Sequence, residues 1–222
     1  GVFTYSSGGR YIGELQAGRR HGRGSFLYPD GASYEGQGQD NSKHGEGTAW
    51  YASGNLYVGQ WLHGKSHGEG TYTYATGARY VGQFEGGKCH GRGTYFYPNG
   101  NKYEGEWKDD MKCGFGTAVY VNKAHYEGQF FMDRRHGSGK MRYSDGGTYE
   151  VTWFVEYQLT LGRFWSYRVC CTPLHCTCQG EWDSGKPHGQ GMATYKDGEK
   201  YVGTYKAGLY HGDGECHPLP TP

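Results

Sequence analysis

Aromatic and polar residues alternate in short runs along this chain, and each run carries a glycine near its centre. The run Tyr103–Trp107, which reads YEGEW, places two rings on one side of an extended backbone, with polar residues between them. Alternation with a period of two is typical of a half-buried β-strand. A second kind of run, such as Gly93–Tyr97, is rich in threonine and aromatic residues, which favour a pleated surface. These patterns predict an all-β chain.

Turn signals separate the runs. A polar segment that bears glycine follows the first run, and the second run ends in a short turn sequence such as PNG at residues 98–100 or PDG at residues 29–31. Each pair of runs is therefore expected to form one β-hairpin. The links are too short for a parallel crossover, so successive hairpins should build an antiparallel meander.

The hairpins repeat with a fixed period. The first tyrosine of each unit recurs every 23 residues, then the register breaks, Cys178 stands at a lead position, and the frame resumes at Tyr201. This predicts about nine stacked units, divided into regular repeats (residues 1–148), a degenerate repeat with an insertion (149–177) and two further repeats, the last incomplete (178–222). Because the sequence opens and closes inside a unit, we expect a fragment, a trimmed chain or frayed ends. The regular lead positions are Tyr11, Tyr34, Tyr57, Tyr80, Tyr103, Tyr126 and Tyr149.

Glycine recurs inside the predicted strands, where it normally weakens the ladder. We interpret this recurrence as the place where an aromatic ring lies flat over bare backbone. Aromatic residues make up 17% of the chain although its mean hydropathy is −0.87, so tyrosine and tryptophan should supply the core. The structural positions in three consecutive units are Tyr57, Gly59, Trp61, His67, Gly68, Gly70, Tyr80, Gly82, Phe84, His90, Gly91, Gly93, Tyr103, Gly105 and Trp107, and the rings of Tyr74 and Tyr97 are expected to join the core.

The frame of Tyr-x-Gly, a large ring, His-Gly-x-Gly and a closing glycine resembles the MORN repeat, the membrane occupation and recognition nexus motif, over nearly all of residues 5–215. The resemblance implies an elongated, single-layer twisted β-ribbon that serves as a scaffold in cilia, cytoskeletal collars or membrane junctions. Among chains made of these repeats with no catalytic domain, the sequence most resembles radial spoke head and related flagellar proteins. Two positions depart from the frame: Gly38 replaces the large ring, and Cys113 replaces the histidine.

A row of histidines recurs in the frame at His21, His44, His67, His90, His136, His188 and His211. Equivalent positions lie two strands apart, about 9–10 Å, whereas zinc ligands each lie within about 2.1 Å of one ion. We therefore expect a structural row, with each imidazole hydrogen-bonded to turn backbone.

The segment VCCTPLHCTC is the one candidate for a metal site. It offers soft ligands for tetrahedral zinc, although its spacing lacks paired CxxC knuckles. An interaction loop with free thiols is the alternative interpretation. The candidate ligands are Cys170, Cys171, His175, Cys176 and Cys178.

Basic residues recur in the first turn of each unit and should line up along one edge of the ribbon, while the opposite turns carry acidic or amide residues such as Asp30 and Asn99. Such an edge could attract an acidic protein or anionic lipid, or it could simply keep the ribbon soluble. The candidate edge comprises Arg19, Arg20, Lys43, Lys65, Lys88, Lys112, Arg134, Arg135 and Lys186.

Several functional classes are not supported by the sequence. The net charge of +1 argues against nucleic-acid binding, no run approaches the roughly 20 apolar residues of a membrane span, and no secretory signal is visible. The seven cysteines form no disulfide frame, which favours a reducing cytoplasm. No nucleophile, phosphate-loop or zinc-protease motif is present.

The sequence therefore predicts a protein without catalytic activity or cofactors, which holds other proteins together in a ciliary or flagellar axoneme or another cytoskeletal assembly. Two alternatives remain. The chain could be an adaptor that binds anionic lipids, or the regulatory repeat region of a larger enzyme. Unpaired strands at the two ends of the ribbon could also join copies of the chain into a homo-oligomer.

Overall fold

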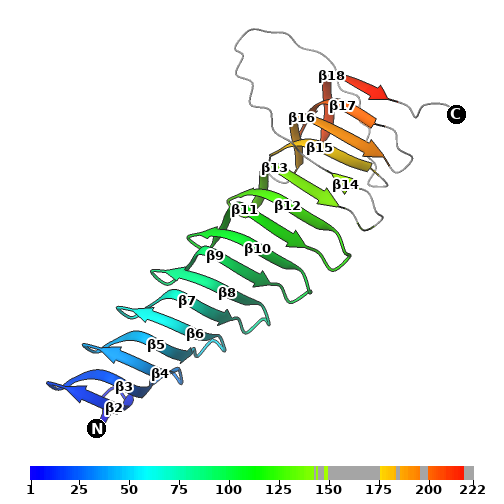
Figure 1. The fold of residues 1–222 in the computed structure, drawn as a ribbon. Coiled ribbons are helices and arrows are strands. Elements are labelled where there is room, and N and C mark those ends of the chain that lie inside the picture. The colour runs from blue at the N-terminus through cyan, green and yellow to red at the C-terminus, as the bar shows by residue number, and fades with distance from the viewer. Residues whose placement is uncertain (143, 145–147, 150–175, 184–185, 196–199, 218–222) are drawn as a thin grey trace. The chain divides into compact units, whose positions relative to one another are not determined.

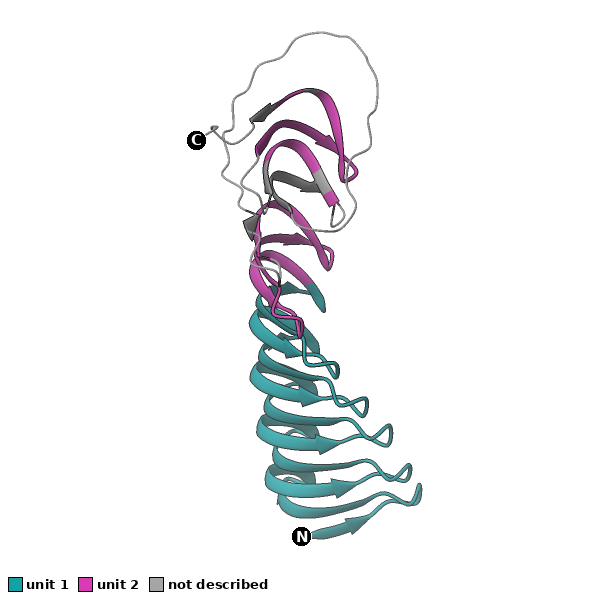
Figure 2. Cartoon of the chain, turned by 90° about the vertical axis from the view of Figure 1, so that its right-hand side faces the viewer, with its two compact units in different colours: residues 1–111 teal, residues 112–222 magenta. Residues whose placement is uncertain are grey.

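The computed structural model describes residues 1–142, 144, 148–149, 176–183, 186–195 and 200–217 (Figure 1). Every element within these ranges is a β-strand. Two compact units make up the chain, Gly1–Met111 and Lys112–Pro222 (Figure 2). No helix that could cross a membrane occurs in the described residues.

In the first unit each strand pairs antiparallel with the next strand in sequence, from β1 to β10. Figure 2 shows these strands in teal as curved ribbons stacked side by side. The strands are β1 (Val2–Thr4), β2 (Arg10–Gln16), β3 (Arg19–Leu27), β4 (Ser33–Gln39), β5 (Ser42–Trp50), β6 (Leu56–Leu62), β7 (Lys65–Thr73), β8 (Arg79–Glu85), β9 (Lys88–Phe96) and β10 (Lys102–Lys108).

The second unit follows the same plan. Residues 150–175, which make up most of the predicted degenerate repeat, lie outside the described residues. The ladder resumes after them, because strand β15 pairs with β13 through Gly137 and Trp182. The strands are β11 (Met111–Val119), β12 (His125–Phe131), β13 (Arg134–Arg142), β14 (Thr148–Tyr149), β15 (Cys176–Asp183), β16 (Lys186–Tyr195), β17 (Lys200–Lys206) and β18 (Leu209–His217). The prediction of an antiparallel meander of hairpins is thus confirmed.

The first turn of each hairpin is short wherever the structure describes its residues. It contains two residues, both in the left-handed region, such as His63 (φ 49°) with Gly64 (φ 82°) and Asp109 (φ 51°) with Asp110 (φ 68°). Two left-handed residues define a type I′ turn, whose twist matches that of the flanking strands. The His-Gly-x-Gly segment, whose histidine was expected to hydrogen-bond to turn backbone, lies inside the second strand, as in β9.

That segment forms a bulge in the second strand. Gly82 pairs with Gly93 and Phe84 pairs with Cys89, so β9 carries two more residues than β8 over the same stretch. The chain accommodates them because Gly91 adopts a left-handed conformation (φ 60°), which costs glycine little.

Paired strand glycines form a continuous row across the first unit, from Gly13 in β2 to Gly105 in β10. The lead tyrosine of each hairpin covers this row. A Cβ atom on Gly70 would lie 2.5 Å from Oη and 2.7 Å from Cε2 of Tyr57, closer than real carbon atoms approach. The predicted seating of rings on bare backbone is therefore confirmed.

Candidate binding surface on the inner face

The inner face of the sheet is the one that carries the lead tyrosines, and its rings interlock. The ring of Trp61 lies 5.4 Å from that of Tyr34 and 5.0 Å from that of Tyr57, nearly perpendicular to both. Phe84 contacts Tyr57 and Tyr80 in the same way, each at 5.0 Å. Edge-to-face geometry is favourable for aromatic pairs. Each of these two large rings thus joins its own hairpin to the preceding one.

The buried hydroxyl groups of the lead tyrosines also form hydrogen bonds. Tyr57 donates its hydroxyl hydrogen to the carbonyl of Gln60 at 2.8 Å, and Tyr80 donates to Gln83 at 2.9 Å. Burial raises the pKa of both phenols far above the ordinary value of 10.0. These tyrosines are structural core residues and offer no reactive group.

A second set of rings lines the inner face nearer the long turns and is only half-buried. Successive rings lie 4.3–5.9 Å apart, in two groups. Tyr74 and Tyr97, which the sequence placed in the core, belong to this partly exposed set. We call the set the tyrosine row; it comprises Phe26, Tyr28, Tyr51, Tyr72, Tyr74, Tyr95 and Tyr97.

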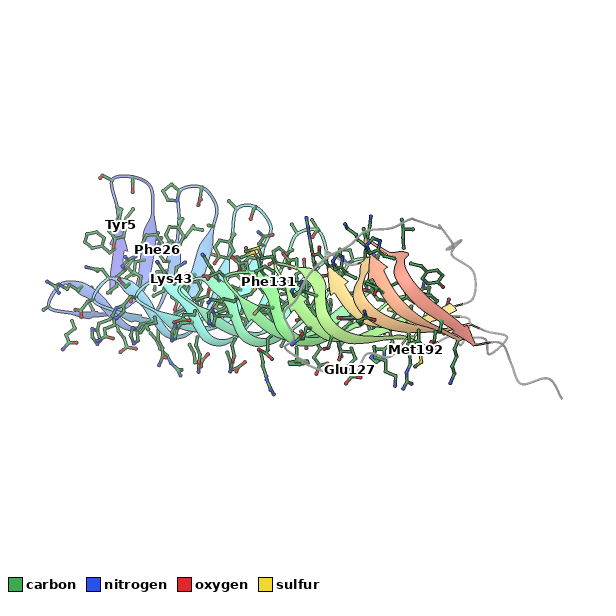
Figure 3. The ribbon with its side chains drawn as sticks, turned by 90° about the horizontal axis from the view of Figure 1, so that it is seen from above. Tyr5, Phe26, Lys43, Glu127, Phe131 and Met192 are labelled. Carbon is green, nitrogen blue, oxygen red and sulfur yellow. The ribbon has the colours of Figure 1, made fainter. Side chains whose placement is uncertain are left out.

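The aromatic lining changes at Gly38, where the other regular hairpins carry a larger side chain. A cavity of about 40 Å³ lies beside it, lined by rings of both aromatic sets and by Arg20 and Lys43. Lys43 Nζ stands 4.5 Å from the ring centroid of Trp61 and 5.2 Å from that of Tyr34. Figure 3 shows Tyr5, Phe26 and Lys43 near one another on the inner side of the bent strands.

The predicted basic edge divides into two groups. Arg20, Lys43 and Arg135 turn inward over aromatic rings. The more exposed cations are partly matched by carboxylates of the next turn. Arg19 lies 3.4 Å from Asp40, Lys88 lies 3.2 Å from Asp109, and Lys112, which is half-buried, lies 3.9 Å from Asp133, whereas Lys65, Arg134 and Lys186 are exposed. The edge is therefore not a uniform basic strip.

The histidines do not share one role. The Nδ1 atom of His188 accepts a hydrogen bond from the turn N–H of Ala207 at 3.5 Å, as predicted for the whole row. His90 instead contacts the carboxylate of Glu85 at 3.3 Å, and His44 Nδ1 is buried without a hydrogen-bond partner. The expectation of a shared turn contact is therefore wrong for these two residues, because the segment lies in the bulge and not in the turn.

A further structural position escaped the sequence interpretation. The side chain of Gln83 accepts a hydrogen bond at 3.0 Å from the N–H of Arg92, a residue that the bulge leaves without a register partner in β8. Gln60 and Gln37 do the same for the N–H groups of Glu69 and Glu46. The recurrence of glutamine or glutamate three residues after the lead tyrosines from Tyr11 to Tyr126 was the available signal.

Most of the candidate metal site lies outside the described residues. Cys170, Cys171 and His175 lie outside the described residues, and Cys176 and Cys178 belong to β15, where their side chains are not described. In the described part of the chain, no three His, Cys, Asp or Glu side chains gather in a way that could hold a metal ion.

A family model described as "MORN repeat" matches eight segments of the chain, which begin at the predicted lead positions and leave out residues 149–177. The segments are 11–33, 34–56, 57–79, 80–102, 103–124, 126–148, 178–200 and 201–217.

Two curated relatives match short parts of the chain. "ALS2 C-terminal-like protein" of Mus musculus is 43% identical over 53 residues, which are 23% of this chain and 6% of that protein. "Alsin" of Rattus norvegicus is 51% identical over 39 residues, which are 18% of this chain and 2% of that protein. The chain thus spans only a small part of the length of these relatives.

Among solved structures, the SAS-4 (dCPAP) TCP domain of Drosophila melanogaster, in complex with a proline-rich motif of Ana2, aligns with 98% of this chain and 88% of its own. The TM-score is 0.40 at 13% sequence identity. A score this low establishes no common fold.

Proposed function

The chain belongs to the MORN repeat family, and from this premise we propose that it is a non-catalytic scaffold which docks other proteins of a cytoskeletal assembly on its inner aromatic face. MORN repeats indicate either a scaffold or a membrane-binding role. The observation that favours the scaffold is the tyrosine row, a repeated surface of half-buried rings that core packing leaves accessible. Rigid, partly exposed tyrosines are characteristic anchors of protein interfaces.

The assembly that we propose is the axoneme of a cilium or flagellum. The support is the resemblance of the repeat frame to radial spoke head and related flagellar proteins. A chain of repeated hairpins, with no catalytic motif in its sequence, suits a structural component that binds several neighbouring proteins.

Proximity labelling in ciliated cells tests this function. The chain fused to a labelling enzyme should enrich axonemal or other cytoskeletal proteins. Tyr51→Glu places a charge in the tyrosine row and should lose that enrichment. Val58→Glu is the matched control, because Val58 is 46% exposed on the outer face, and it should leave the enrichment intact. Enrichment of unrelated soluble proteins alone would refute the proposal.

Binding to anionic membranes is the second candidate, favoured by the exposed cations Lys65 and Arg134. The carboxylates of Asp40 and Asp109 beside neighbouring cations weaken it, since they reduce the attraction to a negative surface. Co-sedimentation with phosphatidylserine vesicles at low salt separates the two functions. Binding that Lys65→Met with Arg134→Met abolishes would favour the membrane.

A role as the regulatory repeat region of a larger enzyme is the third candidate. The matching segments of both curated relatives are small parts of much longer chains. Sequencing the complete reading frame tests this candidate directly. A catalytic domain encoded in the same frame would favour the regulatory role over that of an independent scaffold.

A further inference from the structure

The gap at Gly38 interrupts an otherwise regular row of large side chains. The equivalent residues in the next three hairpins are Trp61, Phe84 and Trp107, all of them buried. Gly38 pairs across the ladder with Lys43, as Trp61 pairs with Ser66 and Phe84 with Cys89. The backbone of Gly38 is not in the left-handed region, so its conformation does not require glycine. A Cβ atom there would lie 3.5 Å from its nearest neighbour, the carbonyl oxygen of Ser42, which is an ordinary contact distance. The missing ring is therefore not a requirement of the fold.

Two cations take the place of that ring. Arg20 and Lys43 both line the cavity beside Gly38, and the carbon Cζ of Arg20 lies 4.7 Å from the ring centroid of Phe26. Neither cation forms an ion pair with any residue that the structure describes. Arg20 Nη2 donates to the carbonyl of Asn41 at 2.6 Å, but its Nε is buried without a hydrogen-bond partner. Burial, and then the charge of Arg20, lower the pKa of Lys43.

Such an arrangement is unfavourable in isolation. Burying charges costs free energy unless they are paired, and the surrounding rings offset only part of that cost through cation–π contacts. An arriving carboxylate would pair with both cations at once, and guanidinium–carboxylate pairs are among the strongest hydrogen-bonded contacts in proteins. A cavity of about 40 Å³ exceeds the roughly 10–15 Å³ that one water molecule needs. It therefore has room for one small anionic group.

We propose that the cavity between Arg20, Lys43 and Gly38 is an anion-binding pocket that receives an aspartate or glutamate side chain of a partner peptide lying along the tyrosine row. This rests on the proposed function and names the chemistry of the partner. Both cations are half-buried among rings on the inner face, so a narrow extended chain can reach them, whereas a flat membrane surface meets the protruding cations of the turns. Carboxylates of the peptide would pair with the cations and its apolar residues would pack on tyrosine rings.

Fluorescence anisotropy with two labelled peptides tests the pocket on the full 222-residue chain. One peptide alternates glutamate with proline, because proline stiffens an extended chain and packs on aromatic grooves. The other alternates glutamine with proline. The glutamate peptide should bind at least about tenfold more tightly, as expected when desolvated charges pair.

Three variants locate the binding. Lys43→Met keeps an apolar side chain against the rings and removes the charge. It should weaken binding of the glutamate peptide about tenfold. Gly38→Trp supplies the ring found at Trp61 and should remove binding without lowering the melting temperature. Lys65→Met removes an exposed cation from the neighbouring turn and should change nothing. Circular dichroism checks that each variant folds.

The outcomes separate this inference from the proposed function. Equal binding of both peptides that is lost in Tyr51→Glu would overturn the anion pocket but keep the docking face. No binding of the glutamate peptide at millimolar concentration would overturn the pocket. So would unchanged affinity in both Lys43→Met and Gly38→Trp, or binding of phosphatidylserine vesicles in place of the peptide.

Discussion

The ring of Tyr57 lies directly on Gly70 of the neighbouring strand, so that a Cβ atom there would come within 2.5 Å of the phenol oxygen. The same relation recurs between Tyr80 and Gly93. The lead tyrosine and the strand glycine therefore act as one unit of packing. The glycine lets the ring lie flat, and the ring covers backbone that would otherwise face solvent.

Replacement of Gly70 by alanine should destabilise the chain by about 1–3 kcal/mol, because the added methyl group must displace a buried ring. Gly38→Ala is the matched control. Its Cβ meets nothing closer than 3.5 Å, so the free energy of unfolding should stay within about 1 kcal/mol of the wild type. Urea denaturation of both variants measures the difference. Equal stability of the two would show that the ring does not depend on bare backbone.

The repeat, the hairpins and the seating of rings on glycine could be predicted from the sequence, because each leaves a local periodic mark. The position of the His-Gly-x-Gly segment could not. A glycine that opens a turn and a glycine such as Gly91, which allows a bulge within a strand, look alike in sequence. The difference depends on the pairing of Phe84 with Cys89, a contact between strands.

The candidate site was predictable only in part. The sequence analysis grouped Lys43, nine residues after its lead tyrosine, with Lys65, eight residues after its own, yet side chains of adjacent strand positions point to opposite faces. Lys43 therefore lies inward near Trp61, while Lys65 is exposed. The departure at Gly38 was visible in the sequence, but its consequence depends on which residues line the space.

Tyr57→Phe keeps the ring and removes the hydrogen bond from its hydroxyl to the carbonyl of Gln60. We expect a loss of about 1 kcal/mol, the typical net value of such a bond. Tyr57→Ala should cost about 3–5 kcal/mol, since it removes a fully buried ring that also contacts Trp61 and Phe84. Thermal and urea unfolding measure both. A smaller loss for alanine than for phenylalanine would contradict the ring ladder as the source of stability.

The buried tyrosines also predict alkaline unfolding. Burial raises the pKa of Tyr57, Tyr80 and Tyr126 above their ordinary value of 10.0, so the folded chain holds them neutral at a pH where the unfolded chain ionises them. Their contribution to stability is complete below about pH 10 and falls as the pH rises further. The free energy of unfolding, measured in urea across this range, should decline, and the tyrosinate absorbance of these three residues, identified by its loss in their Tyr→Phe variants, should appear only with unfolding. Tyrosinate formation at these three residues in the folded chain would refute their burial.

Cys89 should resist alkylation although it is not in a disulfide. Burial, followed by the charge of Asp110 and a hydrogen bond to that carboxylate, raises the pKa of the thiol from 9.0 to about 12. Because the thiolate is the nucleophile, iodoacetamide at about pH 9 should modify the half-buried Cys113 well before Cys89. Mass spectrometry of the labelled peptides over time measures both rates.

Asp110→Asn tests the cause of that resistance. Asp110 accepts the backbone N–H of Cys89 at 2.8 Å, and Asn41 accepts that of Arg20 at 2.9 Å in an equivalent turn, so asparagine preserves the contact. The variant loses the charge and should label faster at Cys89, yet still more slowly than at Cys113, because burial is the larger cause. In the wild type, the stability that the neutral thiol provides is present below about pH 9 and is lost as the pH rises towards 12. Labelling of Cys89 in the wild type as fast as in the urea-unfolded chain would show that the thiol is not buried in the folded chain.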